Sequence, residues 1–203
     1  MPQATSQAWR LIESPPAGIA SHMALDRELF EAFLKDPETP PLLRIYRVTE
    51  PSISVGRSYR NRKQGEVCVR PTGGGLVEHG RDLIYSVIAR RDTFPTFHQV
   101  RTSYLSFHEA VCAAFQKFGI EARLLRCDEA KRNTGLGECF RDPVATDVLV
   151  DGKKAAGGAQ WRRGRNFLHQ GSVRLMRGIS FEALKPALIE SVADLFGIVW
   201  RPG

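Results

Sequence analysis

The sequence has few of the features that mark secreted, membrane-spanning or metal-dependent proteins. No apolar run approaches the ~18 residues that a membrane-spanning helix needs, and the first residues lack the apolar core of a secretion signal. The 4 cysteines form no CxxC pair, and the 5 histidines show no HExxH-type spacing. These absences argue against a metal site and predict a cytoplasmic protein with reduced thiols and no membrane partner.

Positive charge is the main bias of the composition. Lysine and arginine number 29 against 22 aspartates and glutamates, which gives a net charge of +7 at pH 7. This excess favours an acidic partner. Because the arginines are spread along the chain instead of forming a block, nucleic acid is a less favoured partner than an acidic protein.

Length and hydrophobic patterning predict one α+β domain over residues 1–203. Polar residues and two adjacent prolines predict an irregular lead-in over residues 1–18. Apolar spacings of three and four predict helices over 23–34, 100–118 and 181–195, the last one capped by Ser180. Apolar runs bounded by turn residues predict strands over 43–48, 53–55, 67–69, 83–89, 148–150 and 167–175. Clustered strands and single helices together predict a central, largely antiparallel or mixed sheet flanked by helices.

Three consecutive glycines follow an arginine in Arg70-Pro71-Thr72-Gly73-Gly74-Gly75. A plain turn needs one or two glycines, and each costs ~0.5–1 kcal/mol relative to alanine in a regular element. Three allow a ligand to lie against backbone N–H groups, and Arg70 could add a charge for a carboxylate or phosphate. The alternative is a flexible hairpin loop. The pattern matches neither a dinucleotide-binding nor a nucleoside-triphosphate loop.

A lysine leads into a run of small residues in Lys153-Lys154-Ala155-Ala156-Gly157-Gly158-Ala159-Gln160. The preceding Asp151-Gly152 pair predicts a tight hairpin turn. Small side chains leave room for a narrow apolar ligand, and a nearby lysine could polarise its carbonyl group. The alternative is a solvated turn lysine followed by a closely packed strand.

Cysteine and histidine supply two further candidates. Cys139 lies in the expected long loop 126–146, and loops of that length are uncommon unless they have a function. A lone cysteine is more often a small core residue than a nucleophile, and Cys68, Cys112 and Cys127 are interpreted in that way. His169 could act as a base, although a buried sheet histidine is the more common case.

Taken in chain order, these segments resemble the catalytic domain shared by lipoate–protein ligases, octanoyltransferases and biotin–protein ligases. The similarity runs from about Met23 to Leu195, most of the chain. The matching segments are Met23-Ala24-Leu25-Asp26 with the opening helix, 46–56 with a strand pair, 70–75 plus His79 with the substrate loop, 147–160 with the lysine hairpin and 168–173 with the strand after it.

The resemblance implies a biotin/lipoate protein ligase-like fold, with the acyl chain in a tunnel between the glycine loop and the lysine hairpin. It implies that Cys139 and Lys154 are catalytic. The substrate-binding residues that it implies are Arg70, Thr72, Gly73, Gly74, Gly75, His79, Asp147, Gly157, Gly158, Ala159, His169 and Gly171. It implies no metal ligand among them.

Members of this family divide by chemistry, and two features favour the transferase branch. Gly137-Glu138-Cys139-Phe140 resembles the loop that carries a nucleophilic cysteine in one group of transferases. Thr146-Asp147 stands where adenylating members often have Asn-Asp, and we expect no accessory domain at the carboxyl end. The implied reaction moves an octanoyl or lipoyl group from a carrier thioester, such as an acyl carrier protein, through an acyl-Cys139 intermediate and without a cofactor.

The implied acceptor is a lysine on an acidic lipoyl-carrier domain, either glycine cleavage H protein or a 2-oxoacid dehydrogenase E2. Lys154 would lower the pKa of the Cys139 thiol and later accept the proton of the acceptor amine. Two alternatives stay open. One is an ATP- and Mg²⁺-dependent lipoate–protein ligase that forms lipoyl-adenylate, and the other is a non-catalytic member that binds a carrier or nucleic acid.

Overall fold

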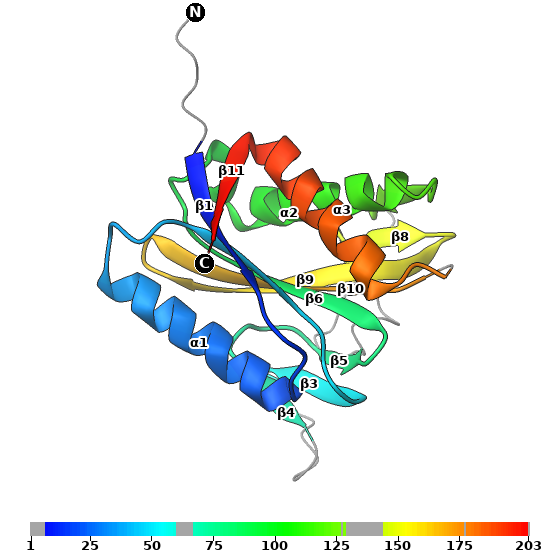
Figure 1. Ribbon diagram of the computed structural model, residues 1–203, viewed down its shortest axis with the longest axis horizontal. Helices are drawn as coiled ribbons and strands as arrows, with labels where there is room; N and C mark the ends of the chain where they lie inside the picture. Colours follow the sequence, from blue (N-terminus) through cyan, green and yellow to red (C-terminus); the bar gives the residue numbers. More distant parts are fainter. Residues whose placement is uncertain (1–6, 60–66, 127, 129–143, 177, 203) are drawn as a thin grey trace, which may run out of the picture.

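The computed structural model describes residues 7–59, 67–126, 128, 144–176 and 178–202. Within these ranges the chain forms an eight-stranded sheet, a three-stranded sheet and three α-helices (Figure 1). Helix α1 (Ile19–Lys35) and the small sheet lie against one face of the large sheet, and α2 (Val100–Gln116) and α3 (Phe181–Phe196) cover the other. This arrangement confirms the predicted α+β class. No helix in the described ranges is long and apolar enough to cross a membrane.

Both sheets are mixed. The large sheet has the order β11 (Ile198–Pro202), β1 (Gln7–Glu13), β2 (Leu42–Tyr46), β6 (Asp82–Arg90), β10 (Asn166–Arg174), β9 (Lys153–Arg163), β8 (Val148–Val150) and β7 (Ala122–Leu124). The small sheet has the order β4 (Cys68–Arg70), β3 (Ser52–Gly56) and β5 (Leu76–His79). β1 is parallel to β11 and β2, and β3 is parallel to β4, whereas the other pairs are antiparallel.

The two faces of the large sheet differ in the side chains that they bury. β6 is buried from Asp82 to Ala89, as expected of a near-continuous apolar run. The main core lies between the sheet and α2 with α3, where Phe97, Phe107 and Phe167 pack together. Two smaller apolar clusters lie on the α1 face. Polar groups interrupt the α1 face, and the candidate site lies there.

The helix boundaries follow local signals. The hydroxyl of Ser180 accepts a hydrogen bond from the Ala183 N–H at 3.1 Å, which confirms the predicted cap of α3. α1 extends to Ile19, one turn before the expected start, and ends at Lys35, just before Pro37. A 3₁₀ turn, η1 (Pro95–Phe97), precedes α2.

The prediction of an irregular lead-in over residues 1–18 is wrong for residues 7–13, which form β1 inside the large sheet, and residues 1–6 lie outside the described residues. Trp9 is fully buried and stacks on Phe196 of α3 at 6.1 Å between ring centroids. β1 pairs with β11, a strand that the sequence did not predict at all. Within the described ranges, β1 lies between β2 and β11, and β11 joins the sheet only through its pairing with β1.

Candidate active site

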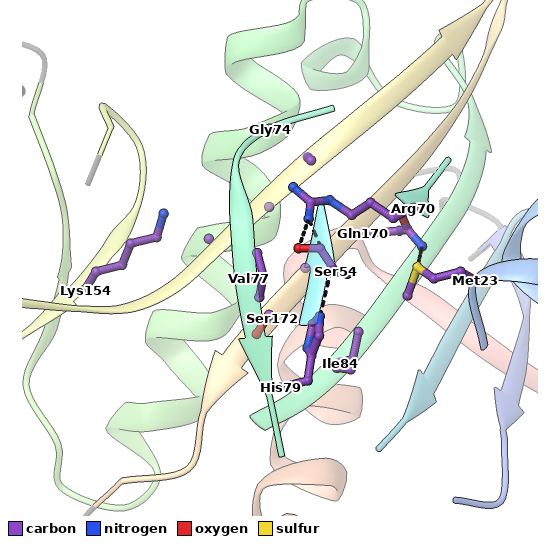
Figure 2. A pocket seen from close by; sticks show the side chains of 14 residues that line it. Met23, Ser54, Arg70, Gly74, Val77, His79, Ile84, Lys154, Gln170 and Ser172 are labelled. Atoms are coloured by element: carbon purple, nitrogen blue, oxygen red, sulfur yellow. Dashed lines mark hydrogen bonds between the residues drawn. The ribbon is translucent and has the colours of Figure 1, made fainter. Parts of the chain in front are cut away.

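A pocket lies between the small sheet and the α1 face of the large sheet (Figure 2). Its wall is built mainly from apolar side chains and glycines. The lining residues are Met23, Ser54, Arg70, Gly74, Val77, His79, Ile84, Lys154, Gly157, Gly158, Ala159, Gln170, Gly171 and Ser172. Figure 2 shows Lys154 on one side of the pocket and Met23 on the opposite side, with Gly74 and Val77 between them. The arrangement suits a narrow apolar ligand that extends away from a lysine.

One wall is the glycine-loop arm, which consists of β3, β4, residues 71–75 and β5. The Arg70 guanidinium is buried and donates hydrogen bonds to the carbonyls of Gly73 at 2.7 Å, Gly75 at 2.8 Å and Ser54 at 3.2 Å. These donors therefore fix the fold of the loop, and the expected contact of Arg70 with a ligand carboxylate or phosphate stays a prediction. Gly74 has φ +88°, a conformation that favours glycine. A Cβ on Gly56 would lie 2.2 Å from the Gly74 oxygen, so this close backbone approach also requires a glycine.

His79 joins the glycine-loop arm to the large sheet. Its Nδ1 lies 2.7 Å from an Asp82 carboxylate oxygen and its Nε2 lies 2.8 Å from the Ser54 hydroxyl. Ser172 of β10 donates to the same Asp82 oxygen at 2.7 Å. This hydrogen-bond order resembles a serine-hydrolase triad. However, Ser54 is fully buried and its oxygen also accepts from Arg70 at 3.2 Å, so the chain of bonds supports Arg70.

Gln170 connects the glycine loop to a charged cluster under the pocket. Its oxygen accepts from the Thr72 hydroxyl at 2.7 Å, and its amide group donates to Asp26 at 2.6 Å. Asp26 also forms a buried ion pair with Arg44 at 2.7 Å and accepts from the Tyr46 hydroxyl at 2.7 Å. Buried charges persist only where they are paired and hydrogen-bonded. The cluster therefore fixes the base of the glycine-loop arm.

The opposite wall is the lysine arm, which consists of residues 144–147, β8 and the start of β9. The predicted hairpin is confirmed, with positive φ at Asp151 (+49°) and Gly152 (+72°) in its turn. The Lys154 ammonium lies 2.6 Å from an Asp147 carboxylate oxygen, and both side chains are nearly inaccessible to solvent. A Cβ on Gly157 would lie 2.6–2.8 Å from Lys154 and Asp147, so this glycine leaves the space that the ion pair occupies.

The turn that carries Asp147 is strained. Asp147 N–H donates to the Val144 carbonyl at 3.0 Å, and Val144 N–H donates to the Asp147 carboxylate at 2.7 Å. Thr146, the third residue of this turn, has φ +83°. Turns of this kind favour glycine or asparagine at the third position, and a β-branched residue there costs on the order of 1–3 kcal/mol.

The structure brings most of the predicted substrate-binding residues to the pocket or its immediate support. Arg70, Gly74, His79, Lys154, Gly157, Gly158, Ala159 and Gly171 line it. Thr72, Gly73 and Gly75 act through the bonds described above, and Asp147 holds Lys154. The sequence reasoning missed Ser54, Asp82 and Gln170, because single polar residues within strands carry no distinctive spacing.

His169 differs from the other predicted residues, because its ring points to the face of β10 that α2 covers. It is fully buried beside Phe107 and lies 3.2 Å from the Tyr85 hydroxyl. Burial lowers its pKa well below the usual value for histidine. The structure therefore places a neutral His169 in the core, and Gln170 occupies the pocket side of the same strand.

The structure describes two of the four cysteines. Cys139 lies outside the described residues, as does Cys127. Cys112 packs against the main core, and burial raises the pKa of its thiol to about 11, which agrees with a structural role. Burial also raises the pKa of Cys68. No group of three His, Cys, Asp or Glu side chains suited to holding a metal ion occurs within the ranges that the structure describes.

The sequence also matches a known protein family. The model of the lipoyl protein ligase A/B catalytic domain matches residues 19–192. The chain belongs to this family. Among curated relatives, octanoyltransferase LipM of Kyrpidia tusciae is 32% identical over 184 residues, covering 83% of this chain, and the protein of the same name from Bacillus subtilis is 31% identical over 185 residues, again 83%. This chain spans 66% of the length of each of these relatives.

Solved structures show the same fold as this member of the lipoyl protein ligase A/B family. A lipoate–protein ligase A bound with ATP superposes with a TM-score of 0.76 at 20% identity, covering 98% of this chain and 88% of the other. A bi-partite lipoate protein ligase from Thermoplasma acidophilum has a TM-score of 0.71 at 20% identity, covering 97% and 87%. The family identification confirms the resemblance that the sequence motifs predicted.

Proposed function

We propose that this protein transfers an octanoyl group from a carrier thioester to a lysine of a lipoyl-carrier domain. The observation that carries this proposal is the pocket that ends at the buried Lys154–Asp147 ion pair. The pocket suits an acyl chain, and Lys154 then lies beside the carbonyl group. The octanoyltransferase names of the curated relatives support the same substrate class.

Cys139 is the proposed nucleophile. A free thiol is only a few per cent ionised at neutral pH, and a nearby ammonium raises that fraction. The Cys139 thiolate attacks the thioester carbonyl, the bond from the carbonyl to the carrier sulfur breaks, and the departing thiolate takes a proton from Lys154. The acyl group then resides on Cys139 as a new thioester.

The second half-reaction reverses the proton movement. The acceptor lysine attacks as a free amine, gives its proton to the now neutral Lys154 and forms the amide, and Cys139 leaves as a thiolate. Asp147 keeps Lys154 in place through both steps. We propose that the donor is an acyl carrier protein and that the acceptor domain is acidic, because the chain carries a net charge of +7. A cytoplasmic location fits these partners.

An ATP-dependent lipoate–protein ligase is the second candidate. The likeness to an ATP-bound ligase favours it, although at 20% identity this likeness reaches only as far as the fold. A ligase would need ATP and Mg²⁺ and would act on free lipoate. The transferase needs neither.

Intact-mass spectrometry after mixing with an octanoyl-carrier thioester, without ATP, tests the proposal. We expect one added octanoyl mass that hydroxylamine removes and that is absent from Cys139→Ala. Product formed only with ATP and free acid would identify the ligase. If neither the enzyme nor an added lipoyl-carrier domain gains an acyl mass under either condition, both candidates are contradicted.

A further inference from the structure

His108 of α2 lies behind the lysine arm and has no part in the mechanism above. Its Nδ1 lies 2.5 Å from the carbonyl oxygen of Thr146, so Nδ1 carries the proton and donates it. The side chain is about 1% exposed, and burial lowers its pKa, which keeps the ring neutral at pH 7. Since a carbonyl oxygen only accepts, this contact fixes both the tautomer and the orientation of the ring.

The Thr146 backbone is held on both sides. Its N–H donates to the Leu125 carbonyl at 2.9 Å, and its own carbonyl accepts from His108. Relaxation of Thr146 from φ +83° to a negative φ would rotate its peptide groups and break these contacts. The peptide group between Thr146 and Asp147 is held at two points, because Asp147 N–H donates to the Val144 carbonyl at 3.0 Å and the Thr146 carbonyl accepts from His108 at 2.5 Å. The His108 bond is the side-chain contact among these restraints.

The strained turn sets the position of the ion pair. Asp147 follows Thr146 directly, and its carboxylate accepts from Val144 N–H at 2.7 Å and pairs with Lys154 at 2.6 Å. A rotation at Thr146 would move the Asp147 backbone and carry its carboxylate away from Lys154. The ion pair packs directly against the Gly157 backbone, since a Cβ there would lie 2.6–2.8 Å from Lys154 and Asp147.

We propose that His108 is a positioning residue for this site: its Nδ1–H holds Thr146 in the strained turn that sets Asp147 against Lys154. The consequence for acyl transfer rests on the proposed function, whereas the structural consequence does not. His108 is not among the residues that line the pocket, and its hydrogen bond goes to Thr146.

Three variants separate the hydrogen bond from simple packing. His108→Leu keeps apolar bulk and removes the donor. His108→Asn keeps a donor, because the asparagine amide can reach the position of the histidine Nδ1. Adding Thr146→Gly to His108→Leu removes the strain, so the turn no longer needs the bond.

The measurement is the rate at which acetic anhydride modifies Lys154 in the folded protein, with the exposed Lys153 as internal control. We expect Lys154 to react about tenfold faster in His108→Leu, a change that release of one strained residue can supply. The rate should return towards that of the parent in His108→Asn and in His108→Leu/Thr146→Gly, while Lys153 stays constant. For octanoyl transfer we expect the opposite order: kcat falls in His108→Leu and returns towards the parent value in His108→Asn and in His108→Leu/Thr146→Gly, with KM for the carrier unchanged.

Unchanged Lys154 labelling in His108→Leu would overturn the proposal. It would also be overturned if His108→Asn behaved like His108→Leu, since ring packing and not the donor would then matter. If His108→Leu lowers the melting temperature, Lys154 labelling of the double variant below that temperature still tests the proposal. The proposal is overturned if Thr146→Gly does not restore the slow labelling of Lys154, because strain at Thr146 then has no role. If the Lys154 labelling rates change as expected but even the parent protein transfers no octanoyl group, only the proposed function is contradicted.

Discussion

The two arms of the pocket are held in different ways. The glycine-loop arm rests on many mutually supporting bonds, because Arg70 donates to three backbone carbonyls and Gln170 links Thr72 to the buried Asp26–Arg44 pair. In the part of the chain that the structure describes, the lysine arm is held mainly by the Lys154–Asp147 ion pair and by the strained turn at Thr146, which His108 and Leu125 support. Damage to the first arm should therefore affect folding, and damage to the second should affect chemistry.

The largest expected effect is the loss of Asp26. Asp26→Ala leaves Arg44 as a buried charge without its partner and removes the acceptor for Gln170, so we expect about 3–5 kcal/mol less stability. Chemical denaturation followed by circular dichroism measures it. Glu31→Ala, an exposed change on the same helix, is the matched control. A midpoint for Asp26→Ala equal to that of the control would contradict the account of the glycine-loop arm.

A methyl group at Gly157 should affect the lysine arm with little effect on folding. The added Cβ would displace Lys154 and Asp147, and a shift of about 1 Å at a catalytic group can cost on the order of 100-fold in rate. Gly73→Ala is the control from the other arm, since a Cβ there meets no atom within 4 Å. Steady-state octanoyl transfer and melting temperature should be measured for both. Equal rates in the two variants would remove the distinction between the arms.

Acid should lower the stability of the fold on which both arms rest. Burial lowers the pKa values of His22, which accepts from Arg44, and of His108 and His169. Below about pH 6.5 the unfolded chain binds protons at these positions and the folded chain does not, so stability falls as pH decreases, by up to about 1.4 kcal/mol per pH unit for each histidine. Denaturation from pH 7.5 to 5.5 measures the slope. His169→Gln should flatten it, and a slope independent of this residue would argue against a neutral buried ring.

Sequence reasoning found the parts of the site whose residues are adjacent in the chain. The run Arg70 to Gly75 and the run Lys153 to Gln160 both lie on the pocket, as predicted. Arg44 and Gln170 escaped notice, and Asp26 was matched only as part of the opening helix, because their significance depends on contacts across up to 144 residues of chain. Neighbouring residues of a strand point to opposite faces of the sheet, and the sequence does not show which face binds a ligand. His169 was therefore predicted as a site residue, although Gln170 is the one that lies in the pocket.

The prediction of the fold was limited in the same way, because it missed elements that depend on contacts distant in the chain. Helices with a strong apolar face and most strands bounded by glycine or proline were predicted close to their observed positions, although β5 was not predicted. β1 and β11 were not, because neither has a pronounced alternation and each is stabilised by the other and by Trp9 packing on Phe196. Pairing between the two ends of a chain is set by tertiary packing, which local patterns do not record.

The most direct test of the central claim is single-turnover octanoyl transfer by Lys154→Arg, followed by intact-mass spectrometry of enzyme and acceptor domain. Arginine keeps the positive charge but stays protonated, so it cannot accept the proton of the acceptor amine. The account predicts slow or partial octanoylation of Cys139 and almost no transfer to the carrier lysine, with an unchanged melting temperature. Full transfer by Lys154→Arg would contradict the account and would place proton acceptance at another group.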